Sequence, residues 1–456
     1  MSNTLRRLLG DPRRIGFFGI GRSNLSLMSG LWDGVSVTLR SDKEIPNEAI
    51  PKGITPERIL CGASALSDIN EDCLILSPSV NRKRAEIIEA QSRGVTVTSD
   101  CELFFKAADA PVLAVTGSSG KSTTSALTHA IIRGGGRVKG GAVLCGNGGV
   151  PMLRSTENGA GLYVCELSSF MLSYLKSSVK RSAITGITPN HLDFHSSFEE
   201  YRDTKLGLLA LSHEGVISAD DEILYRRYKR KCVFGVFSTE RPLRELVSEF
   251  RAEHYGTLED GWLCHNGEML VHTSELVRRE PFNLKNMLCA VLLSYGYSHR
   301  DAVISALKGF RGLPHRNELA GTINGVRYIN SSIDTTPERC LITLSTYPNR
   351  PILLLGGRGK GLSYDGLIPA LAKSAGAVIC FGEEGERLFS LLQPTARCRL
   401  ADGLASAVKL ACECARPGDT VLLSPACTSY DEFGSFEERG EEFKRLVSLL
   451  GKDNLK

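Results

Sequence analysis

A glycine-bracketed turn with a Lys-Ser pair is the part of this sequence best suited to chemistry. The turn follows the apolar run 112–116 and consists of Gly117, Ser118, Ser119, Gly120, Lys121, Ser122 and Thr123. Gly117 and Gly120 allow the backbone N–H groups to curl around an anion, and the helix predicted after them adds positive potential. Lys121 can reach the terminal phosphates of a nucleotide, and the Ser122 hydroxyl can hold Mg²⁺. A plain strand-to-helix turn is the alternative, because a valine stands where the standard loop has its first glycine.

Polar residues follow two further apolar runs. Glu166 comes directly after the run 162–165, and His191 and His195 follow the strand that we expect over 183–188. The carboxyl ends of parallel strands meet at one edge of a sheet, so these side chains are expected near the phosphate turn, where a carboxylate suits Mg²⁺. A surface glutamate and structural histidines are the alternatives. Lys205 lies in a helix expected over 198–211, where a solvated lysine is the ordinary interpretation.

The first hundred residues indicate a small parallel α/β unit. A strand enters a turn that contains Gly19 and Gly21, and a second strand over 35–40 ends at Ser41 and Asp42. The pattern lacks the third glycine of a dinucleotide fingerprint. A nucleotide diphosphate bound at this turn and a purely structural turn therefore both remain open.

The last third repeats the alternation of strands and helices. Strands are expected over 326–330, 352–355, 377–381 and 420–423, each followed by a glycine or polar turn. The loop 356–361 places Lys360 in a flexible, glycine-rich setting that suits an anion. Gly309, Gly312 and Pro314 mark a boundary before this part of the chain.

Length and composition set the class of protein. The 456 residues are too many for one ordinary core, and 42% hydrophobic with 23% charged residues is typical of a globular protein. A net charge of +4 with scattered basic residues argues against a nucleic-acid surface. The 14 cysteines are mostly isolated, which favours reduced thiols and a cytoplasmic location. No signal peptide or membrane span is evident.

Taken in order, the central motifs resemble those of the Mur ligases, the ATP-dependent amide-bond ligases of peptidoglycan precursor synthesis. The similar segments are 116–123, Gly146-Asn147, 166–170, Asn190-His191-Leu192-Asp193 and Lys205. The resemblance covers essentially the whole chain and implies an α/β protein of three domains. They are a Rossmann-like UDP-binding domain over 1–106, a central P-loop ATPase domain over 107–311, and a Rossmann-like amino-acid-binding domain over 312–456.

The resemblance also implies roles for individual residues. Catalytic roles fall to Lys121, His191 and Lys205. ATP would contact Gly117, Ser118, Ser119, Gly120, Lys121, Ser122, Thr123, Asn283, Asn286 and Arg316. Two Mg²⁺ ions would bind Ser122, Glu166, His191 and Lys205, the last carrying a carbamate. The UDP-linked acceptor would contact Arg22, Ser23, Arg40, Asn147, Ser168 and His191. Asn283 and Asn286 also open a helix, and helix capping is compatible with the adenine role.

Within this family, the C-terminal loops are most similar to those of the member that joins D-glutamate to UDP-N-acetylmuramoyl-L-alanine through an acyl phosphate. Lys360, Ser429 and Phe436 would surround the glutamate. That member has Asn-Asp-Ser-Lys-Ala-Thr-Asn where this chain has Asn-Ser-Ser-Ile-Asp-Thr-Thr over 330–336. Because the lysine is lost at Ile333, we expect another cation, Arg358, to replace it. A monomer is expected, and D- and L-glutamate are both open.

Other functions remain as alternatives. A related Mur ligase or a folylpolyglutamate synthetase-type ligase would share the same ATP centre. A nicotinamide dehydrogenase would leave Lys121 and Ser122 unexplained, and a switch GTPase would need an Asn-Lys-x-Asp signature that the sequence lacks. A regulatory relative without activity is the last alternative.

Overall fold

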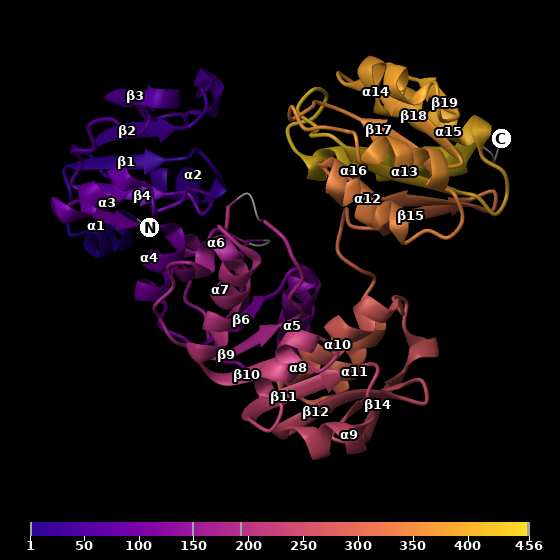
Figure 1. The fold of residues 1–456 in the computed structure, drawn as a ribbon, viewed down its shortest axis with the longest axis horizontal. Coiled ribbons are helices and arrows are strands. Elements are labelled where there is room, and N and C mark those ends of the chain that lie inside the picture. The colour runs from indigo at the N-terminus through magenta and orange to yellow at the C-terminus, as the bar shows by residue number, and fades with distance from the viewer. Residues whose placement is uncertain (1, 148–149, 192–193, 454–456) are drawn as a thin grey trace. The chain divides into compact units, whose positions relative to one another are not determined.

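The computed structural model describes residues 2–147, 150–191 and 194–453 (Figure 1). The chain divides into two compact units, and the boundary in the sequence lies between Phe310 and Arg311. This break lies beside the boundary expected between residues 311 and 312. The first unit contains two separate sheets, so the boundary expected between residues 106 and 107 stays a prediction.

The first sheet of the first unit has five strands, all parallel, in the order β3-β2-β1-β4-β5. Its central strands are buried, as expected for a parallel sheet covered by helices. The strands are β1 (Arg14–Phe18), β2 (Ser36–Ser41), β3 (Arg58–Cys61), β4 (Cys73–Leu76) and β5 (Thr96–Thr98). The helices are α1 (Ser2–Leu9), α2 (Arg22–Met28), α3 (Ala85–Ser92) and α4 (Asp100–Ala107).

The second sheet has nine strands in the order β14-β13-β12-β11-β10-β9-β6-β8-β7. The strands from β12 to β7 run parallel, and β13 and β14 add an antiparallel edge. The parallel strands are β6 (Val112–Thr116), β7 (Ala142–Gly146), β8 (Leu162–Glu166), β9 (Val179–Ile184), β10 (Ser212–Ser218), β11 (Cys232–Ser238) and β12 (Arg251–Glu259). The edge strands are β13 (Trp262–His265) and β14 (Glu268–His272).

One predicted strand is displaced. The strand expected over 183–188 is β9, which covers Val179–Ile184. The residues after it leave the ladder, because the carbonyl of Gly186 accepts from Ser118 N at 2.8 Å and so pairs with the phosphate turn. The polar cluster at His191 therefore follows a loop and not the strand itself.

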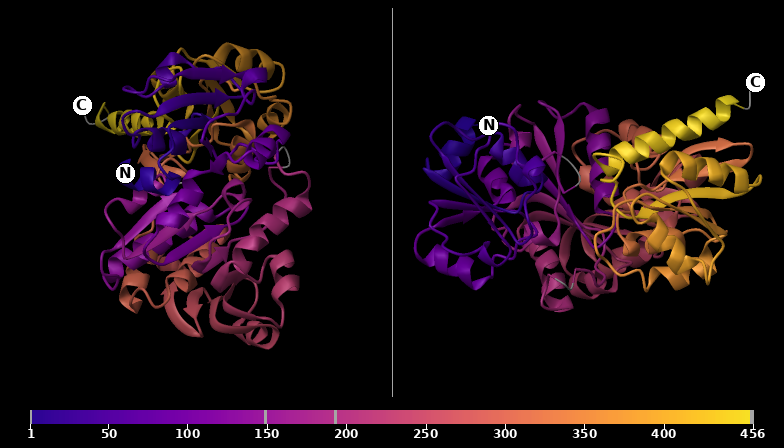
Figure 2. Two further views of the ribbon diagram at one scale, coloured as in Figure 1. Left: turned by 90° about the vertical axis from the view of Figure 1, so that its left-hand side faces the viewer. Right: turned by 90° about the horizontal axis from the view of Figure 1, so that it is seen from above.

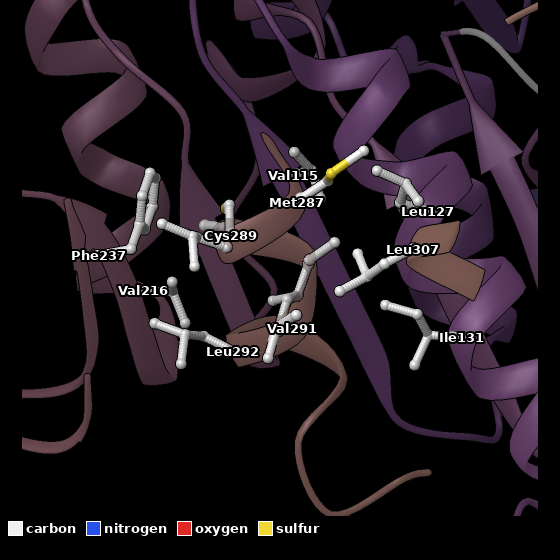
Figure 3. Close-up of a cluster of buried hydrophobic side chains, with 14 of the residues drawn as sticks. Val115, Leu127, Ile131, Val216, Phe237, Met287, Cys289, Val291, Leu292 and Leu307 are labelled. Carbon is white, nitrogen blue, oxygen red and sulfur yellow. The ribbon is translucent and has the colours of Figure 1, made fainter. Parts of the chain in front are cut away.

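Helices α5 and α10 form the core beside the phosphate turn. Side chains of both helices, such as Leu127 and Met287, meet in one buried cluster with Val115 of β6 (Figure 3). α10 is apolar nearly all round and is buried accordingly. The helices of this part are α5 (Lys121–Gly135), α6 (Ser169–Leu172), α7 (Phe198–Ala210), α8 (Glu222–Tyr228), α9 (Leu243–Glu249), α10 (Pro281–Ser294) and α11 (Arg300–Gly309).

The second unit has one sheet of six strands in the order β15-β16-β20-β17-β18-β19, parallel except for the edge strand β15. The long helix α16, which is the yellow helix of Figure 2, packs against β15 and β16. The strands are β15 (Glu318–Ile323), β16 (Val326–Asn330), β17 (Ile352–Gly356), β18 (Ala377–Phe381), β19 (Cys398–Leu400) and β20 (Thr420–Ala426). The helices are α12 (Pro337–Ser345), α13 (Leu367–Ser374), α14 (Gly385–Leu392), α15 (Leu404–Cys414) and α16 (Phe436–Asp453).

These parallel sheets confirm the predicted α/β class. Among the described residues, no helix combines the length and apolar character needed to cross a membrane.

Candidate functional site

The turn between β6 and α5 has the conformation that its glycines allow. Gly117 and Gly120 have φ values of +151° and +79°. A Cβ atom on Gly120 would lie 2.3 Å from Asn286 Oδ1, so only glycine fits without a shift. Lys121 Nζ donates to the carbonyl of Gly117 at 2.9 Å, which folds the lysine back over the turn. Asn286, expected at the adenine, thus lies against the phosphate turn.

The turn is held from its other side by the loop that follows β9. Ser118 Oγ donates to the carbonyl of Thr188 at 2.8 Å and lies 2.9 Å from Tyr201 Oη. Thr185 Oγ1 donates to the carbonyl of Ser119. These bonds restrain the turn without a ligand, as a preorganised anion site requires. Ser122 and Thr123 open α5 directly behind it.

Lys205 is not solvent-exposed, although this is the ordinary interpretation of a lysine in such a helix. Its side chain on α7 is buried, 1% exposed, and Nζ donates to the carbonyl of Gly117 at 2.9 Å. Burial, together with the charge of Lys121, lowers the pKa of Lys205 to about 7. The interpretation as a solvated lysine is therefore wrong. A lysine poised between its two charge states lies at the start of the phosphate turn.

Glu166 ends β8, next to β6 in the sheet. Its Oε1 accepts from Asn147 Nδ2 at 2.9 Å, while Oε2 is buried and has no hydrogen-bond partner among the described residues. A buried, half-satisfied carboxylate is costly unless a cation binds it, so this residue fits a Mg²⁺ ligand. The described residues contain no group of three His, Cys, Asp or Glu side chains that could hold a metal ion alone. Ser168 caps α6, with Met171 N donating to its hydroxyl at 3.3 Å.

His191 lies beside α6, the helix that follows Glu166. Its ring centroid is 5.0 Å from that of Phe170 and 6.4 Å from that of Tyr201, whose hydroxyl contacts Ser118. Its φ of +54° marks a sharp bend after Asn190, whose Oδ1 accepts from His191 N at 2.9 Å. Leu192 and Asp193 of this motif, and Gly148 and Gly149 after Asn147, lie outside the described residues.

The expected role of Arg40 in acceptor binding is not supported. Arg40 is fully buried, and all five of its N–H groups are used inside the protein. They bond Glu71, in an ion pair of 2.8 Å, and the backbone carbonyls of Ala65, Ser67 and Asp68. No donor remains for a ligand, so Arg40 positions this loop.

The other two acceptor candidates lie at the start of α2. Arg22 is the first residue of that helix, after Gly21. Ser23 hydrogen-bonds the buried carboxylate of Asp100, which also accepts from the backbone N–H groups of Met152 and Leu153. Ser23 therefore holds Asp100 of α4, and Asp100 links the helices of the first sheet to residues 152 and 153, which follow β7.

The nucleotide candidates beyond the turn lie on both units. On α10, Asn283 Nδ2 donates to Glu280 Oε2 at 2.9 Å, and Asn286 Oδ1 accepts from Thr124 Oγ1 at 3.4 Å. Arg316 belongs to the second unit, where its backbone N–H donates to the carbonyl of Leu313 at 3.3 Å. The helix-capping alternative fails for Asn283 and Asn286, since the N-cap of α10 is Glu280.

In the second unit, three loops meet at the carboxyl ends of the adjacent strands β16, β20 and β17. Of the expected glutamate residues, Lys360 lies in the loop after β17 and Ser429 in the loop after β20, and Phe436 begins the helix α16 that follows this second loop. Lys360 Nζ donates to Thr335 Oγ1 at 3.2 Å, Ser429 is buried, and the Phe436 carbonyl accepts from Ser332 Oγ at 2.8 Å. Such a strand edge is where ligands bind in open α/β sheets.

A buried arginine that we gave no role in the sequence binds these loops together. Arg439 of α16 donates to Ser332 Oγ and its carbonyl, at 2.9 and 3.0 Å, and to the carbonyls of Cys427 and Thr428, at 3.1 and 2.9 Å. Burial lowers its pKa to about 10. The available signal was that Phe436 and Phe443, three and four residues away, lie on the same helix face, but the partners of Arg439 are distant in sequence.

The expectation that Arg358 replaces the lost lysine stays a prediction, although its guanidinium has a partner of its own. Arg358 Nε pairs with Glu383 Oε2 at 2.7 Å, and its backbone pairs with Thr428. The adjacent Gly357 explains this close approach, because a Cβ atom there would lie 2.1 Å from the Thr428 carbonyl. The guanidinium of Arg358 is thus already paired with a carboxylate.

Comparisons with known proteins agree with this geometry. The family model "Mur ligase middle domain" matches residues 115–294, and "Mur ligase, glutamate ligase domain" matches residues 315–427. A UDP-N-acetylmuramoylalanine--D-glutamate ligase from Ruminiclostridium cellulolyticum is 30% identical over 99% of this chain and 100% of its own length. The chain belongs to the Mur ligase family. The predicted resemblance is confirmed.

Two more members of the Mur ligase family fit this assignment. A UDP-N-acetylmuramoylalanine--D-glutamate ligase from Haemophilus influenzae is 34% identical over 96% of this chain and 98% of its own. The crystal structure of a UDP-N-acetylmuramate-alanine ligase from Thermotoga maritima covers 95% of this chain and 99% of its own, with a TM-score of 0.56 and 19% identity. The structural likeness supports the Mur ligase fold.

Proposed function

We propose that this Mur ligase joins D-glutamate to UDP-N-acetylmuramoyl-L-alanine, with hydrolysis of ATP to ADP and phosphate. The similarity to D-glutamate ligases over almost the whole chain carries this proposal. The phosphate turn with Lys121, and the cationic loop edge of the second unit, supply the two kinds of site that the reaction needs.

The first step forms an acyl phosphate. A carboxylate oxygen of the acceptor attacks the γ-phosphorus of ATP, and ADP leaves. Lys121 and the N–H groups of the turn stabilise charge on the phosphates. The glutamate amine then attacks the acyl carbon, phosphate leaves, and the amine proton is lost to water or phosphate. A related Mur ligase or a folate-type glutamate ligase would follow the same steps with another acceptor.

Mg²⁺ would bind Glu166, Ser122, His191 and Lys205, as two ions. The buried oxygen Glu166 Oε2 and its orienting partner Asn147 support this part of the proposal. When bound, Mg²⁺ neutralises charge that builds up between the acceptor carboxylate and the phosphates.

Lys205 would act as a carbamate. A neutral amine reacts with CO₂ by forming an N–C bond and losing one proton, which leaves an anion. The pKa of about 7 provides neutral Lys205 at physiological pH, which an ordinary lysine does not. The anion would also remove the repulsion between Lys205 and Lys121.

The acceptor would lie along the first unit, against Arg22, Ser23, Asn147, Ser168 and His191. A cytoplasmic monomer is proposed with this activity. The 14 free cysteines, most of them buried or half-buried, fit a reducing compartment.

The deciding experiment is an assay of ADP release over a matrix of acceptors and amino acids. UDP-N-acetylmuramoyl-L-alanine, other UDP-linked muramoyl acceptors and a folate are each paired with D-glutamate and L-glutamate. Activity only with the first acceptor and D-glutamate supports the proposal, whereas activity with the folate selects the alternative ligase.

Lys121→Ala tests the role of the turn in the same assay. We expect acceptor-dependent ADP release to be lost, because Lys121 is the cation at the phosphates. Lys139→Ala, on an exposed lysine beyond the same helix, is the matched control and should retain activity. Retention of full activity by Lys121→Ala would refute the assignment of the ATP site.

A further inference from the structure

In the second unit, two cationic side chains from other segments contact one tight turn. Ile333 and Thr335 form this turn, with Thr335 N donating to the Ile333 carbonyl at 2.8 Å. The same carbonyl accepts from Arg339 at 3.2 Å, and Thr335 Oγ1 accepts from Lys360 Nζ at 3.2 Å. Two positively charged side chains from different elements are therefore anchored two residues apart.

Neither cation is neutralised by a contacting carboxylate. Among the residues described for this unit, no ion pair within 4.0 Å includes Arg339 or Lys360, whereas Arg358 is paired with Glu383. Asp334, the one acidic residue of the loop 331–336, is buried and accepts from Ser424 Oγ at 2.8 Å. Its carboxylate is thus hydrogen-bonded on the side of β20 and forms no ion pair within 4.0 Å with either cation, although the charge of Arg339 acts on it.

Electrostatics support an anion at this place. Partial burial lowers the pKa of Lys360, and the charge of Arg339 lowers it further, so the two cations repel each other. The N-terminus of α12, capped by Thr336, adds positive potential to the same turn. A carboxylate between Arg339 and Lys360 would relieve this repulsion.

We infer that Arg339 is the second cation of the amino-acid site and binds one of the two carboxylates of the incoming glutamate, in place of the lysine lost at position 333. Arg339 reaches this turn from α12, with its guanidinium on the Ile333 carbonyl. Arg339 therefore places a positive charge next to Ile333, the position at which the lysine is lost. This inference rests on the proposed function for the identity of the dicarboxylate.

Kinetics with D-glutamate as the varied substrate test this role. Arg339→Ala should raise KM for D-glutamate about ten- to a hundredfold, the effect of losing one charge-assisted hydrogen bond. The KM for ATP and for the acceptor should stay within about twofold, as for a surface change outside their sites. Arg350→Ala is the matched control. Arg350 is exposed and precedes β17, so it lies at the amino ends of the strands, whereas the three loops lie at the carboxyl ends.

A second variant separates a binding role from a structural one. Arg339→Ala combined with Ile333→Lys returns a cation to the same turn, and we expect it to restore most of the lost affinity. A general loss of folding would not be rescued in this way, and thermal melting of Arg339→Ala checks folding directly. An unchanged KM in Arg339→Ala, or a rise in KM only in Arg358→Ala, would overturn the inference.

Binding measured without turnover separates this inference from the proposed function. NMR titration of D-glutamate into the full chain and into Arg339→Ala reports the contact itself. If the wild type binds D-glutamate through Arg339 but releases no ADP with the acceptor, the proposed function fails and the inference stands. If the wild type turns over and Arg339→Ala binds D-glutamate equally well, the inference fails alone.

Discussion

Two lysines approach a single carbonyl oxygen at the phosphate turn. Lys121 and Lys205 each place Nζ 2.9 Å from the carbonyl of Gly117. Burial disfavours the charged form of Lys205, and the charge of Lys121 at the same carbonyl adds repulsion. The energetic consequence is that the folded protein favours the neutral amine at Lys205, the form that can attack CO₂.

This charge state makes stability depend on pH. The pKa of Lys205 is lowered from 10.5 to about 7, so between these values the unfolded chain binds one proton more than the folded chain. The free energy of unfolding therefore gains up to about 1.4 kcal/mol per pH unit from this group as pH rises. The loss of folding stability caused by Lys205 is largest below pH 7, where the buried amine is protonated.

Lys205→Met tests this expectation in CO₂-depleted buffer. The variant should be more stable than the wild type at pH 7, and this difference should shrink toward pH 9.5. Chemical denaturation at several pH values measures it. Lys176→Met, on an exposed lysine, is the control. A difference that does not change with pH would contradict the buried ammonium.

Asn147 orients the proposed metal ligand Glu166 through a hydrogen bond of 2.9 Å. Asn147→Ala should weaken Mg²⁺ activation by about ten- to a hundredfold, the usual cost of removing such a partner. Titration of the ligase activity with Mg²⁺ measures this shift. Activation at unchanged Mg²⁺ concentration would show that Glu166 needs no orientation.

At the scale of elements, α5 carries a left-handed glycine at each end. Gly120 before the helix has φ +79° and lies against Asn286, whereas Gly136 after the helix has φ +61° and open space around it. Alanine costs about 1 to 2 kcal/mol in this conformation at either position. Only at Gly120 does it also displace a neighbouring side chain.

Gly120→Ala and Gly136→Ala therefore form a matched pair. Both should lower the melting temperature by a similar amount, and Gly120→Ala somewhat more. Only Gly120→Ala should raise the KM for ATP, because it alone shifts the turn and Asn286. Equal KM values in the two variants would show that this turn does not bind the nucleotide.

The sequence predicts local features better than partnerships. The strand–turn–helix at Lys121 follows from adjacent residues, and so does Glu166 at a strand end. From sequence, Arg40 receives the wrong role and Arg439 receives none, because their partners lie in distant loops and become known only once the chain has folded. The end of β9 was missed for the same reason, since the turn at Ser118 takes the hydrogen bond of Gly186.

At the scale of the whole molecule, the second unit has its own core. Two buried clusters lie on the two faces of the six-stranded sheet. All their members, from strands and helices alike, fall within residues 326–447. Both faces of this parallel sheet are thus covered from within the unit, which is the usual condition for independent folding.

A fragment of residues 311–456 should therefore fold alone. Circular dichroism with thermal melting should show α/β structure and one cooperative transition. A fragment that starts at residue 346, without β15, β16 and α12, is the comparison, because β20 loses its neighbour β16 and becomes an exposed edge strand. Absence of a transition in the longer fragment would show that the unit depends on the rest of the chain.

The hydrogen bonds of Arg439 also affect how the substrate preference of such an enzyme can change during evolution. Arg439 fastens the amino-acid loops through main-chain oxygens and one serine, and it makes no use of the side chain at position 333. A lineage can therefore exchange residues on the outer rim of these loops while their scaffold persists. Substrate preference is free to drift at low structural risk.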